Sequence, residues 1–425
     1  RLEEAEASYR QALVLNSDYA EAHSNLGVAL NEMSRLEESE VSFRQAIAFN
    51  PDLADAHINL GIVLHGLGKL EEAEVSYRQA ITLKPDFAEA HSNLGNTLKI
   101  IGSLKESEAS CRQAIALKPD LAMAHNNLGV TLKELSRLDE SEVSCRQAIA
   151  LKSDFAMAYN NLGITLQGMR RLEEAEASYT QAIALKPDYA EAYNNLGTML
   201  QGLDRSEEAE ASYTQAIALK SDYAVANSNL LFLQSGFNYE ASLYLKEAQD
   251  YGRKIAGSVA SRFSNWSCEE KPKTLRIGLV SGDLRGHPVG YFLEGLLDKL
   301  SQSKLEMFGY PTKLLEDELT LRIKPYFTVW QPLASISDEA AARLIHNDGI
   351  HILIDLSGHT AKNSLPIFAW KPAPVQITWL GYFASTGVAE IDYILGDPYV
   401  TPAEEADHFI EKIWQLPESY LCFTE

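Results

Sequence analysis

Apolar and polar positions follow two different rhythms along the chain. From the first residue to about residue 223, apolar residues recur at helical spacing in pairs of short runs, with a polar turn between them. From Thr274 onward, short continuous apolar runs such as TLRIGLVS alternate with amphipathic stretches such as VGYFLEGLLDKL. The pattern predicts helix pairs in the first part, and buried parallel strands alternating with helices in the second.

The helical part repeats with a step of 34 residues. Each unit carries the dipeptide Asn-Leu in its first helix and an aspartate in its closing turn. Such a step is typical of a solenoid, in which each helix pair buries its apolar face on its neighbours. The asparagines of the dipeptide are Asn25, Asn59, Asn93, Asn127, Asn161, Asn195 and Asn229.

These units resemble the tetratricopeptide repeat (TPR). In one unit the slots of the TPR pattern hold His57, Leu60, Gly61, Leu64, Ala73, Tyr77, Ala80 and Pro85. We expect a partial repeat at 1–19, six full repeats at 20–223, capping helices and a polar linker at 224–272, and a second domain at 273–425. The EEAEAS runs are expected to be solvated faces of the second helices.

Two kinds of polar residue recur in the first helices. Four histidines, His23, His57, His91 and His125, share a slot with Tyr159 and Tyr193, so we assign them to packing between helices. The asparagines permit two interpretations: each amide bonds a neighbouring repeat, or the amides form a ladder that binds the backbone of an extended polypeptide along the concave face.

Small, polar and titratable residues follow the predicted strands of the second domain. Asp283, His287 and Pro288 follow TLRIGLVS, and Gly358, His359 and Thr360 follow IHILIDLS. Gly381 and Tyr382, then Thr386 and Gly387, follow PVQITWL. Because ligands bind beyond the carboxyl ends of parallel strands, we expect these loops to line a donor and acceptor cleft. The loop glycines match neither a Walker A motif nor the dinucleotide fingerprint.

Composition narrows the classes of partner and compartment. The formal net charge of −22 argues against nucleic acid and anionic membranes as partners. We find no run of eighteen apolar residues and therefore expect no membrane span. The four cysteines do not form a disulfide framework, and Cys111 and Cys145 occupy the slot of buried aromatic residues. A cytoplasmic location fits this cysteine usage best.

The order of the two parts, with the segments LRIGLVSGDLRGHPVGYF and PAPVQITWLGY, resembles the nucleotide-sugar protein O-glycosyltransferases. This family comprises the O-linked N-acetylglucosamine transferases, their bacterial relatives and the plant SPINDLY proteins. The resemblance implies an inverting, metal-independent GT-B enzyme with two Rossmann-like lobes, of which this chain holds the first. It also implies a nucleotide-sugar donor, with UDP-N-acetylglucosamine expected, and polypeptide acceptors held in the TPR groove.

The resemblance also assigns roles to the loop after the first strand. His287 becomes the candidate base that accepts the proton of a serine or threonine hydroxyl, and Asp283 becomes its partner or a rival base. The chain departs from the animal and plant pattern at Phe383 and from the animal pattern at Val289, and GHTAKN resembles the SPINDLY version, whose donor is GDP-fucose.

Three alternatives stay open at this stage. The lobe is a non-catalytic part of a TPR scaffold, or the enzyme uses GDP-fucose, or it glycosylates asparagine or a small molecule. Because the second lobe of the family is expected to lie beyond Glu425, we expect residues 1–425 alone to be inactive.

Overall fold

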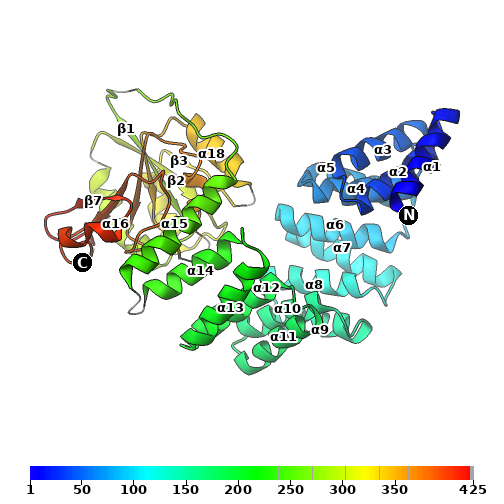
Figure 1. Ribbon diagram of the computed structural model, residues 1–425, viewed down its shortest axis with the longest axis horizontal. Helices are drawn as coiled ribbons and strands as arrows, with labels where there is room; N and C mark the ends of the chain where they lie inside the picture. Colours follow the sequence, from blue (N-terminus) through cyan, green and yellow to red (C-terminus); the bar gives the residue numbers. More distant parts are fainter. Residues whose placement is uncertain (237–239, 270, 302, 335, 361–362, 422–425) are drawn as a thin grey trace. The chain divides into compact units, whose positions relative to one another are not determined.

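The computed structural model describes residues 1–425 except 237–239, 270, 302, 335, 361–362 and 422–425 (Figure 1). The chain divides into two compact units, Arg1–Asn195 and Leu196–Glu425. The predicted fold class is confirmed: a helical TPR array is followed by a lobe built on a parallel sheet.

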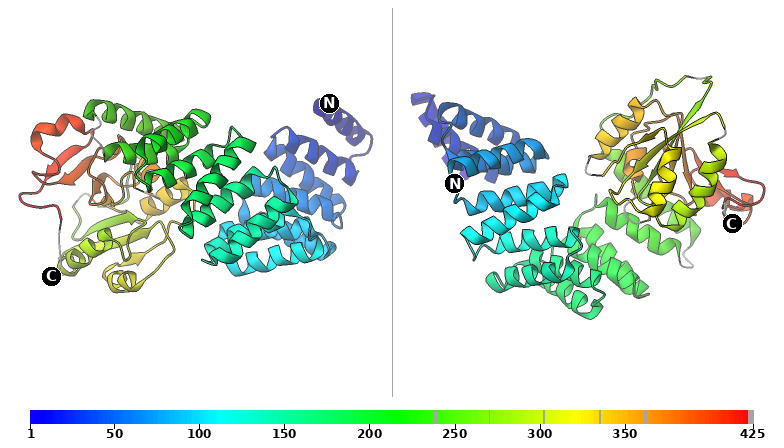
Figure 2. Two further views of the ribbon diagram at one scale, coloured as in Figure 1. Left: turned by 90° about the horizontal axis from the view of Figure 1, so that it is seen from below. Right: turned by 180° about the vertical axis from the view of Figure 1, so that it is seen from behind.

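The first unit is a stack of antiparallel helix pairs, and its successive turns can be followed in Figures 1 and 2. Even-numbered helices are the first helices of the repeats, and odd-numbered helices are the second. The helices are α1 (Leu2–Leu15), α2 (Ala20–Glu32), α3 (Leu36–Phe49), α4 (Ala54–Gly66), α5 (Leu70–Leu83), α6 (Ala88–Ile101), α7 (Leu104–Leu117), α8 (Ala122–Glu134), α9 (Leu138–Leu151), α10 (Ala156–Gly168) and α11 (Leu172–Leu185); α12 (Ala190–Gln201) crosses into the second unit.

The turn inside each repeat places one residue in the left-handed region. Gly68 and Gly102 hold this position with φ of 74° and 93°. At the same slot, Ser34, Ser136, Arg170 and Asp204 have φ between 57° and 61°. A non-glycine residue costs about 1–2 kcal/mol in this conformation, so the tertiary packing of the repeat imposes the turn on these residues.

Close contact between the two helices of a repeat depends on a glycine in the first helix. A Cβ atom on Gly61 would lie 2.6 Å from the ring of Tyr77, and one on Gly95 would lie 2.5 Å from Cys111 Sγ. Cys111 and Cys145 are fully buried, as predicted, and burial raises the pKa of their thiols to about 12 and about 11. In the histidine slot, His57 Nε2 lies 2.9 Å from the carbonyl oxygen of Pro51, so the ring ties its helix to the preceding turn.

Ion pairs connect successive repeats along the second helices. The Arg137 guanidinium lies 2.7 Å from Glu108 of the preceding repeat and 2.6 Å from Glu140 of its own. Arg171 contacts Glu142 and Glu174 in the same way. The acidic residues at the start of each run are exposed, as expected, whereas the last one, such as Glu108 or Glu142, is partly buried and bridges the repeats. Each such surface ion pair contributes little to the free energy of unfolding, and salt weakens it.

The second unit contains a seven-stranded sheet in the order β3-β2-β1-β4-β5-β6-β7, with every neighbouring pair parallel. Its elements are α13 (Ser206–Leu219), α14 (Ala224–Ser235), α15 (Ala241–Gly257), β1 (Leu275–Ser281), α16 (Pro288–Leu300), β2 (Leu305–Pro311), α17 (Glu318–Ile323), η1 (Lys324–Tyr326), β3 (Val329–Trp330), α18 (Asp338–Asn347), β4 (Ile352–Asp355), α19 (Leu365–Phe368), β5 (Val375–Trp379), β6 (Tyr393–Gly396), η2 (Ala403–His408) and β7 (Lys412–Gln415).

Two expectations about these elements were wrong. The run FTVWQPL contributes only the two-residue strand β3, and AEEADHFIEK forms the short 3-10 helix η2 where we expected a longer helix. Strand β7 directly follows that segment and was not predicted. Both misses lie toward the edges of the sheet, where the apolar pattern is weakest because strands are covered less completely.

Separate helices cover the two faces of the sheet. On one face, apolar residues of α15, α18 and α19 pack with Val280, Phe308 and Leu353. On the other face, residues of α16 and α17 pack with Leu279 and Met307. This is the doubly wound arrangement, and it leaves the carboxyl ends of the strands to the connecting loops.

Helix α15 approaches the loop after β5 at backbone distance. A Cβ atom on Gly252 would lie 1.7 Å from the carbonyl oxygen of Gly387. The hydroxyl of Tyr244, from the same helix, is 2.8 Å from the carbonyl oxygen of Ser385 and 2.6 Å from the hydroxyl of Tyr382. The helix therefore fixes the position of this loop.

We expect Gly252→Ala to lower the free energy of unfolding of the second unit by about 2–3 kcal/mol, because the added methyl group overlaps the Gly387 carbonyl. All five tryptophans lie in this unit, so tryptophan fluorescence during denaturant unfolding reports on it alone. Gly257→Ala, on the same helix with no atom within 4 Å of the new methyl group, is the matched control. It should change the stability by less than about 1 kcal/mol. Equal effects of the two substitutions would contradict the packing described.

Candidate active site

The loop between β1 and α16 holds both residues that were predicted to act on the acceptor hydroxyl. The Ser281 hydroxyl at the end of β1 accepts a hydrogen bond of 3.0 Å from the Asp283 backbone N–H. His287 is the N-cap of α16, and Pro288 occupies the first turn, where a backbone N–H is not needed. The strand end and the helix start therefore fix both ends of the loop.

The Asp283 carboxylate lies between cationic side chains. Lys313 Nζ is 3.2 Å and an Arg285 guanidinium nitrogen is 3.4 Å from Oδ1. His287 Nδ1 is 3.8 Å from Oδ2. Asp283 is 8% exposed, whereas 39% of the His287 side chain is exposed. Of the two candidate bases, the imidazole is the one that an acceptor can reach.

Two groups compete for His287 Nδ1. The backbone N–H of Val289 approaches it to 3.4 Å and requires it to accept a hydrogen bond. The Asp283 carboxylate faces the same nitrogen and would accept a proton from it. When Nδ1 carries the proton, Nε2 has a free lone pair, which is the form that can act as a general base.

The histidine after β4 is fully buried. His359 Nε2 donates to the carbonyl oxygen of Thr386 at 3.0 Å, and Nδ1 accepts from the Ser228 hydroxyl at 2.6 Å. The Asn363 amide donates to Ser228 in turn, at 2.9 Å. Burial lowers the pKa of His359 to about 3, so the ring is neutral at physiological pH. Its contacts tie α14 to the loop after β5.

Two buried carboxyl groups hold the neighbouring loops. Asp355 accepts from the backbone N–H groups of Ser357 and Gly358 at 3.1 and 2.8 Å and from the Thr378 hydroxyl at 3.0 Å. Burial raises its pKa to about 6. Glu411, whose pKa is also raised by burial, accepts from Ser385 Oγ at 2.7 Å, from the Thr386 N–H at 2.8 Å and from the Thr386 hydroxyl.

The structure brings the predicted loops together but divides their residues. Tyr382, Thr386 and Gly387 are buried with His359, and Gly358 and Gly381 pack closely on Tyr382 and on the Leu356 carbonyl. Side chains of His287, Pro288 and Thr360 keep exposed surface. The buried residues therefore shape the site from within, whereas His287 and Pro288, at the end of the loop after β1, remain accessible.

The sequence interpretation missed five residues of this region. Lys313 and Arg285 flank Asp283, and the position of Lys313 just after the predicted strand LEMFGYP was the available signal. Asp355 and Glu411 stand at a strand end and a strand start, but nothing in the pattern indicated that they bond loops. Ser228 carried no signal, because its partner His359 lies 131 residues away.

Three of the ladder asparagines hydrogen-bond to the preceding repeat. Asn127 Nδ2 donates to the Ser92 hydroxyl and carbonyl, both at 3.2 Å. Asn161 donates to Asn126 Oδ1 at 2.8 Å, and Asn195 donates to Asn160 Oδ1 at 3.0 Å. In Asn161 and Asn195 this bond uses one of the two N–H groups of the amide, so these two side chains retain a donor for a further ligand. Asn25 is exposed, Asn127 is buried, and Asn59, Asn93, Asn161, Asn195 and Asn229 are half-buried.

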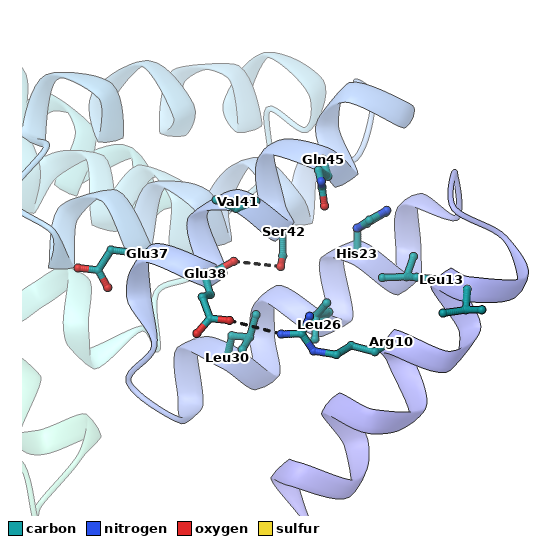
Figure 3. A pocket seen from close by; sticks show the side chains of 11 residues that line it. Arg10, Leu13, His23, Leu26, Leu30, Glu37, Glu38, Val41, Ser42 and Gln45 are labelled. Carbon is teal, nitrogen blue, oxygen red and sulfur yellow. Dashed lines mark hydrogen bonds and ion pairs between the residues drawn. The ribbon is translucent and has the colours of Figure 1, made fainter.

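A groove of about 720 Å³ lies between α1 and α3 over α2 (Figure 3). Arg10, Leu30, Glu38, Val41 and Ser42 contribute to its lining. Residues 102 positions later, which is three repeats, line a second groove: Arg112, Leu132, Glu140, Val143 and Ser144. The groove is therefore a property of the stacking of second helices and does not mark one special site. A hollow of about 40 Å³ beside Asp283 is lined by Gly282, Leu284, Arg285 and Lys313, among others.

Neither a metal-binding cluster nor a membrane-spanning helix occurs in the part of the chain that the structure describes. Among the residues that the structure describes, no three or more His, Cys, Asp or Glu side chains are grouped so as to hold a metal ion. None of the described helices combines the length and apolarity needed to cross a bilayer.

Comparison with known proteins separates the same two parts. Residues 254–423 match Glycosyl transferase family 41, and residues 1–102, 88–155 and 154–222 match tetratricopeptide repeat families. The probable UDP-N-acetylglucosamine–peptide N-acetylglucosaminyltransferase SPINDLY of Oryza sativa subsp. japonica is 32% identical over 201 residues, which are 45% of this chain and 21% of that protein. The SEC protein of Arabidopsis thaliana is 34% identical over 149 residues, 35% of this chain and 15% of the relative.

The chain is also similar to a solved structure with the same kind of name. A mutant of the O-GlcNAc transferase of Thermobaculum terrenum superposes with a TM-score of 0.66 at 30% identity, over 71% of this chain and 58% of that one. The chain spans about a fifth of the length of the plant SPINDLY proteins that it matches.

The fold and the site thus define a TPR array joined to a family 41 glycosyltransferase lobe. The chain belongs to the TPR-containing O-GlcNAc transferase and SPINDLY family. The family resemblance that was predicted from the sequence is confirmed.

The buried His359 predicts a pH dependence of stability. Its pKa is about 3 in the folded lobe and about 6.5 when unfolded, so as the pH falls below about 6.5 the unfolded state binds a proton that the folded state does not. This proton uptake lowers the free energy of unfolding by up to about 1.4 kcal/mol per pH unit. In His359→Gln this contribution is absent, so the stability advantage of the wild type over the variant should shrink on acidification from about pH 7 to about pH 5.

Tryptophan-monitored unfolding of both proteins across this range measures the difference. Asp355, whose raised pKa acts in the opposite direction, is present in both proteins and cancels. A constant difference would show that His359 accepts a proton in the folded lobe without cost.

Proposed function

We propose that the protein transfers a sugar from a nucleotide donor to serine or threonine hydroxyl groups of polypeptides held along the asparagine ladder. The observation that carries this proposal is the exposed His287 imidazole beside Asp283, at the carboxyl edge of a family 41 lobe that follows an asparagine-lined array. By the names of the relatives, the donor is UDP-N-acetylglucosamine. The buried thiols of the array fit the cytoplasmic location that we propose.

His287 acts as the base in this proposal. The hydroxyl oxygen attacks the anomeric carbon, the bond from that carbon to the nucleoside diphosphate breaks, and the hydroxyl proton passes to Nε2 of His287. The reaction inverts the anomeric configuration and needs no metal ion. Asp283 is less accessible, and Arg285 and Lys313 engage it, so it serves to orient the His287 ring and to stabilise the imidazolium that forms.

The buried residues around His359 position the site. Their hydrogen bonds connect α14 with the loops after β4 and β5, so these loops cannot shift independently. Preorganised loops keep the acceptor hydroxyl and the donor in attack geometry. We therefore assign a positioning role to His359, Tyr382 and Thr386.

His287→Ala should lower kcat/KM for sugar transfer about a hundredfold or more, because the acceptor hydroxyl loses its base. The assay is run with the product of the complete gene and, in parallel, with residues 1–425. Labelled UDP-N-acetylglucosamine and labelled GDP-fucose are supplied as alternative donors. His408→Ala is the control, since the exposed fraction of its side chain is also 39%. If His287→Ala keeps its turnover while Asp283→Asn abolishes it, Asp283 is the base and our assignment is wrong.

Simultaneous replacement of Asn127, Asn161 and Asn195 by alanine should reduce transfer to intact proteins by about tenfold or more and leave transfer to short peptides nearly unchanged. The reason is that the ladder holds the polypeptide away from the reacting centre. Because these amides also bond adjacent repeats, Ser92→Ala serves as the control: it removes a partner of Asn127 but keeps the amide. Equal loss with long and short acceptors would exclude a role of the ladder in holding the substrate.

A further inference from the structure

A basic cluster lies on the first helices of three successive repeats in the first unit. His65 of α4, Lys99 of α6 and Lys133 of α8 occupy one slot, 34 residues apart. The same slot holds Asn31, Gln167 and Gln201 in other repeats. In this slot, lysine ammonium groups therefore occur only at Lys99 and Lys133, in the middle of an array whose acidic residues outnumber its basic ones.

An amide joins the members of the cluster. Lys99 Nζ donates to Asn96 Oδ1 at 3.0 Å, and Asn96 Nδ2 lies 3.3 Å from His65 Nε2. The ammonium of Lys133 is 2.8 Å from Glu134. Lys99 is half-buried, and none of the described residues forms an ion pair with it. Most other cations of the array contact a carboxylate or an aromatic ring, so Lys99 is an exception.

The electrostatics of Lys99 favour an anionic partner. Burial lowers the pKa of its ammonium, Glu134 opposes this shift, and Lys133 adds to it. A partly desolvated cation with no carboxylate in direct contact raises the free energy of the folded chain, and a carboxylate within hydrogen-bond distance would offset that cost.

The cluster adjoins the asparagine ladder through Asn96, which lies one helical step from Asn93 of the ladder and one from Lys99. In α6, Asn93, Asn96 and Lys99 follow each other at three-residue spacing and are all half-buried. The ladder asparagine stands six residues before the slot in each helix: Asn59 before His65 in α4 and Asn127 before Lys133 in α8, as Asn93 does before Lys99 in α6. A chain that bonds the ladder amides would therefore pass beside Lys99.

We propose that His65, Asn96, Lys99 and Lys133 form a subsite for an acidic side chain of the polypeptide that the array holds. This inference rests on the proposed function, because it assumes a polypeptide along the ladder. Lys99 Nζ and the Asn96 amide bind the carboxylate, and Lys133 supplies further positive charge. The subsite gives the array a preference for acidic segments, although bonds to the peptide backbone alone carry no sequence preference.

The test compares two synthetic peptides of equal length, amidated at the C-terminus, that differ only in carrying glutamate or glutamine at the same positions. Fluorescence anisotropy with residues 1–425 measures the Kd of each. The wild-type chain should bind the glutamate peptide about fivefold more tightly, and added salt should remove the difference. Lys99→Met, which keeps the aliphatic stem, should weaken binding of the glutamate peptide to the level of the glutamine peptide.

Lys105→Ala, an exposed lysine on the second helix α7, is the matched control and should leave both Kd values unchanged. Circular dichroism checks that each variant is folded. If Lys99→Met raises the Kd of both peptides equally, or of neither, the subsite does not exist. The proposed ladder function stands in that case if replacing Asn127, Asn161 and Asn195 by alanine still weakens binding of the glutamine peptide. If neither peptide binds the wild-type chain, both the subsite and the proposed ladder function fail.

Discussion

The strict 34-residue step is the constraint on which the array depends. A single helix pair cannot bury its own apolar face, so each repeat must present the same surface to the next one. The step therefore fixes a glycine opposite a large side chain, an arginine beside a glutamate of the preceding repeat, and a left-handed residue in each inner turn. It also forces chemically similar side chains into rows. The asparagine ladder and the slot of His65, Lys99 and Lys133 are two such rows.

In the lobe, which has no sequence repeat, buried polar groups determine how the loops are arranged. Asp355, His359 and Glu411 are fully or almost fully buried, and each is hydrogen-bonded to backbone or hydroxyl groups of the loops at the carboxyl edge. Buried polar groups are stable only when their partners are in place, so these networks specify one arrangement of the loops. The cost is a dependence on protonation state, because burial raises the pKa of the two acids and lowers that of the histidine.

The contrast between the two loop histidines has a simple physical cause. His359 is enclosed between α14 and the loop after β5, where an imidazolium would be desolvated. His287 caps α16 at the surface, with a carboxylate nearby. Only the second environment leaves the imidazole accessible to a hydroxyl group from outside the lobe. Burial therefore distinguishes the positioning residue from the candidate base.

The sequence by itself determined the repeat, the alternation of strands and helices, the order of the two parts and the family, because hydrophobic periodicity and short motifs are local signals. It also placed Asp283 and His287 on one loop, since four residues separate them. Only the tertiary structure decided that Lys313 and Arg285 flank Asp283, that His359 is buried against Ser228, and that Asn96 links His65 to Lys99. These contacts join residues from different elements, and which surfaces become buried is set by packing rather than by the sequence around any one of them.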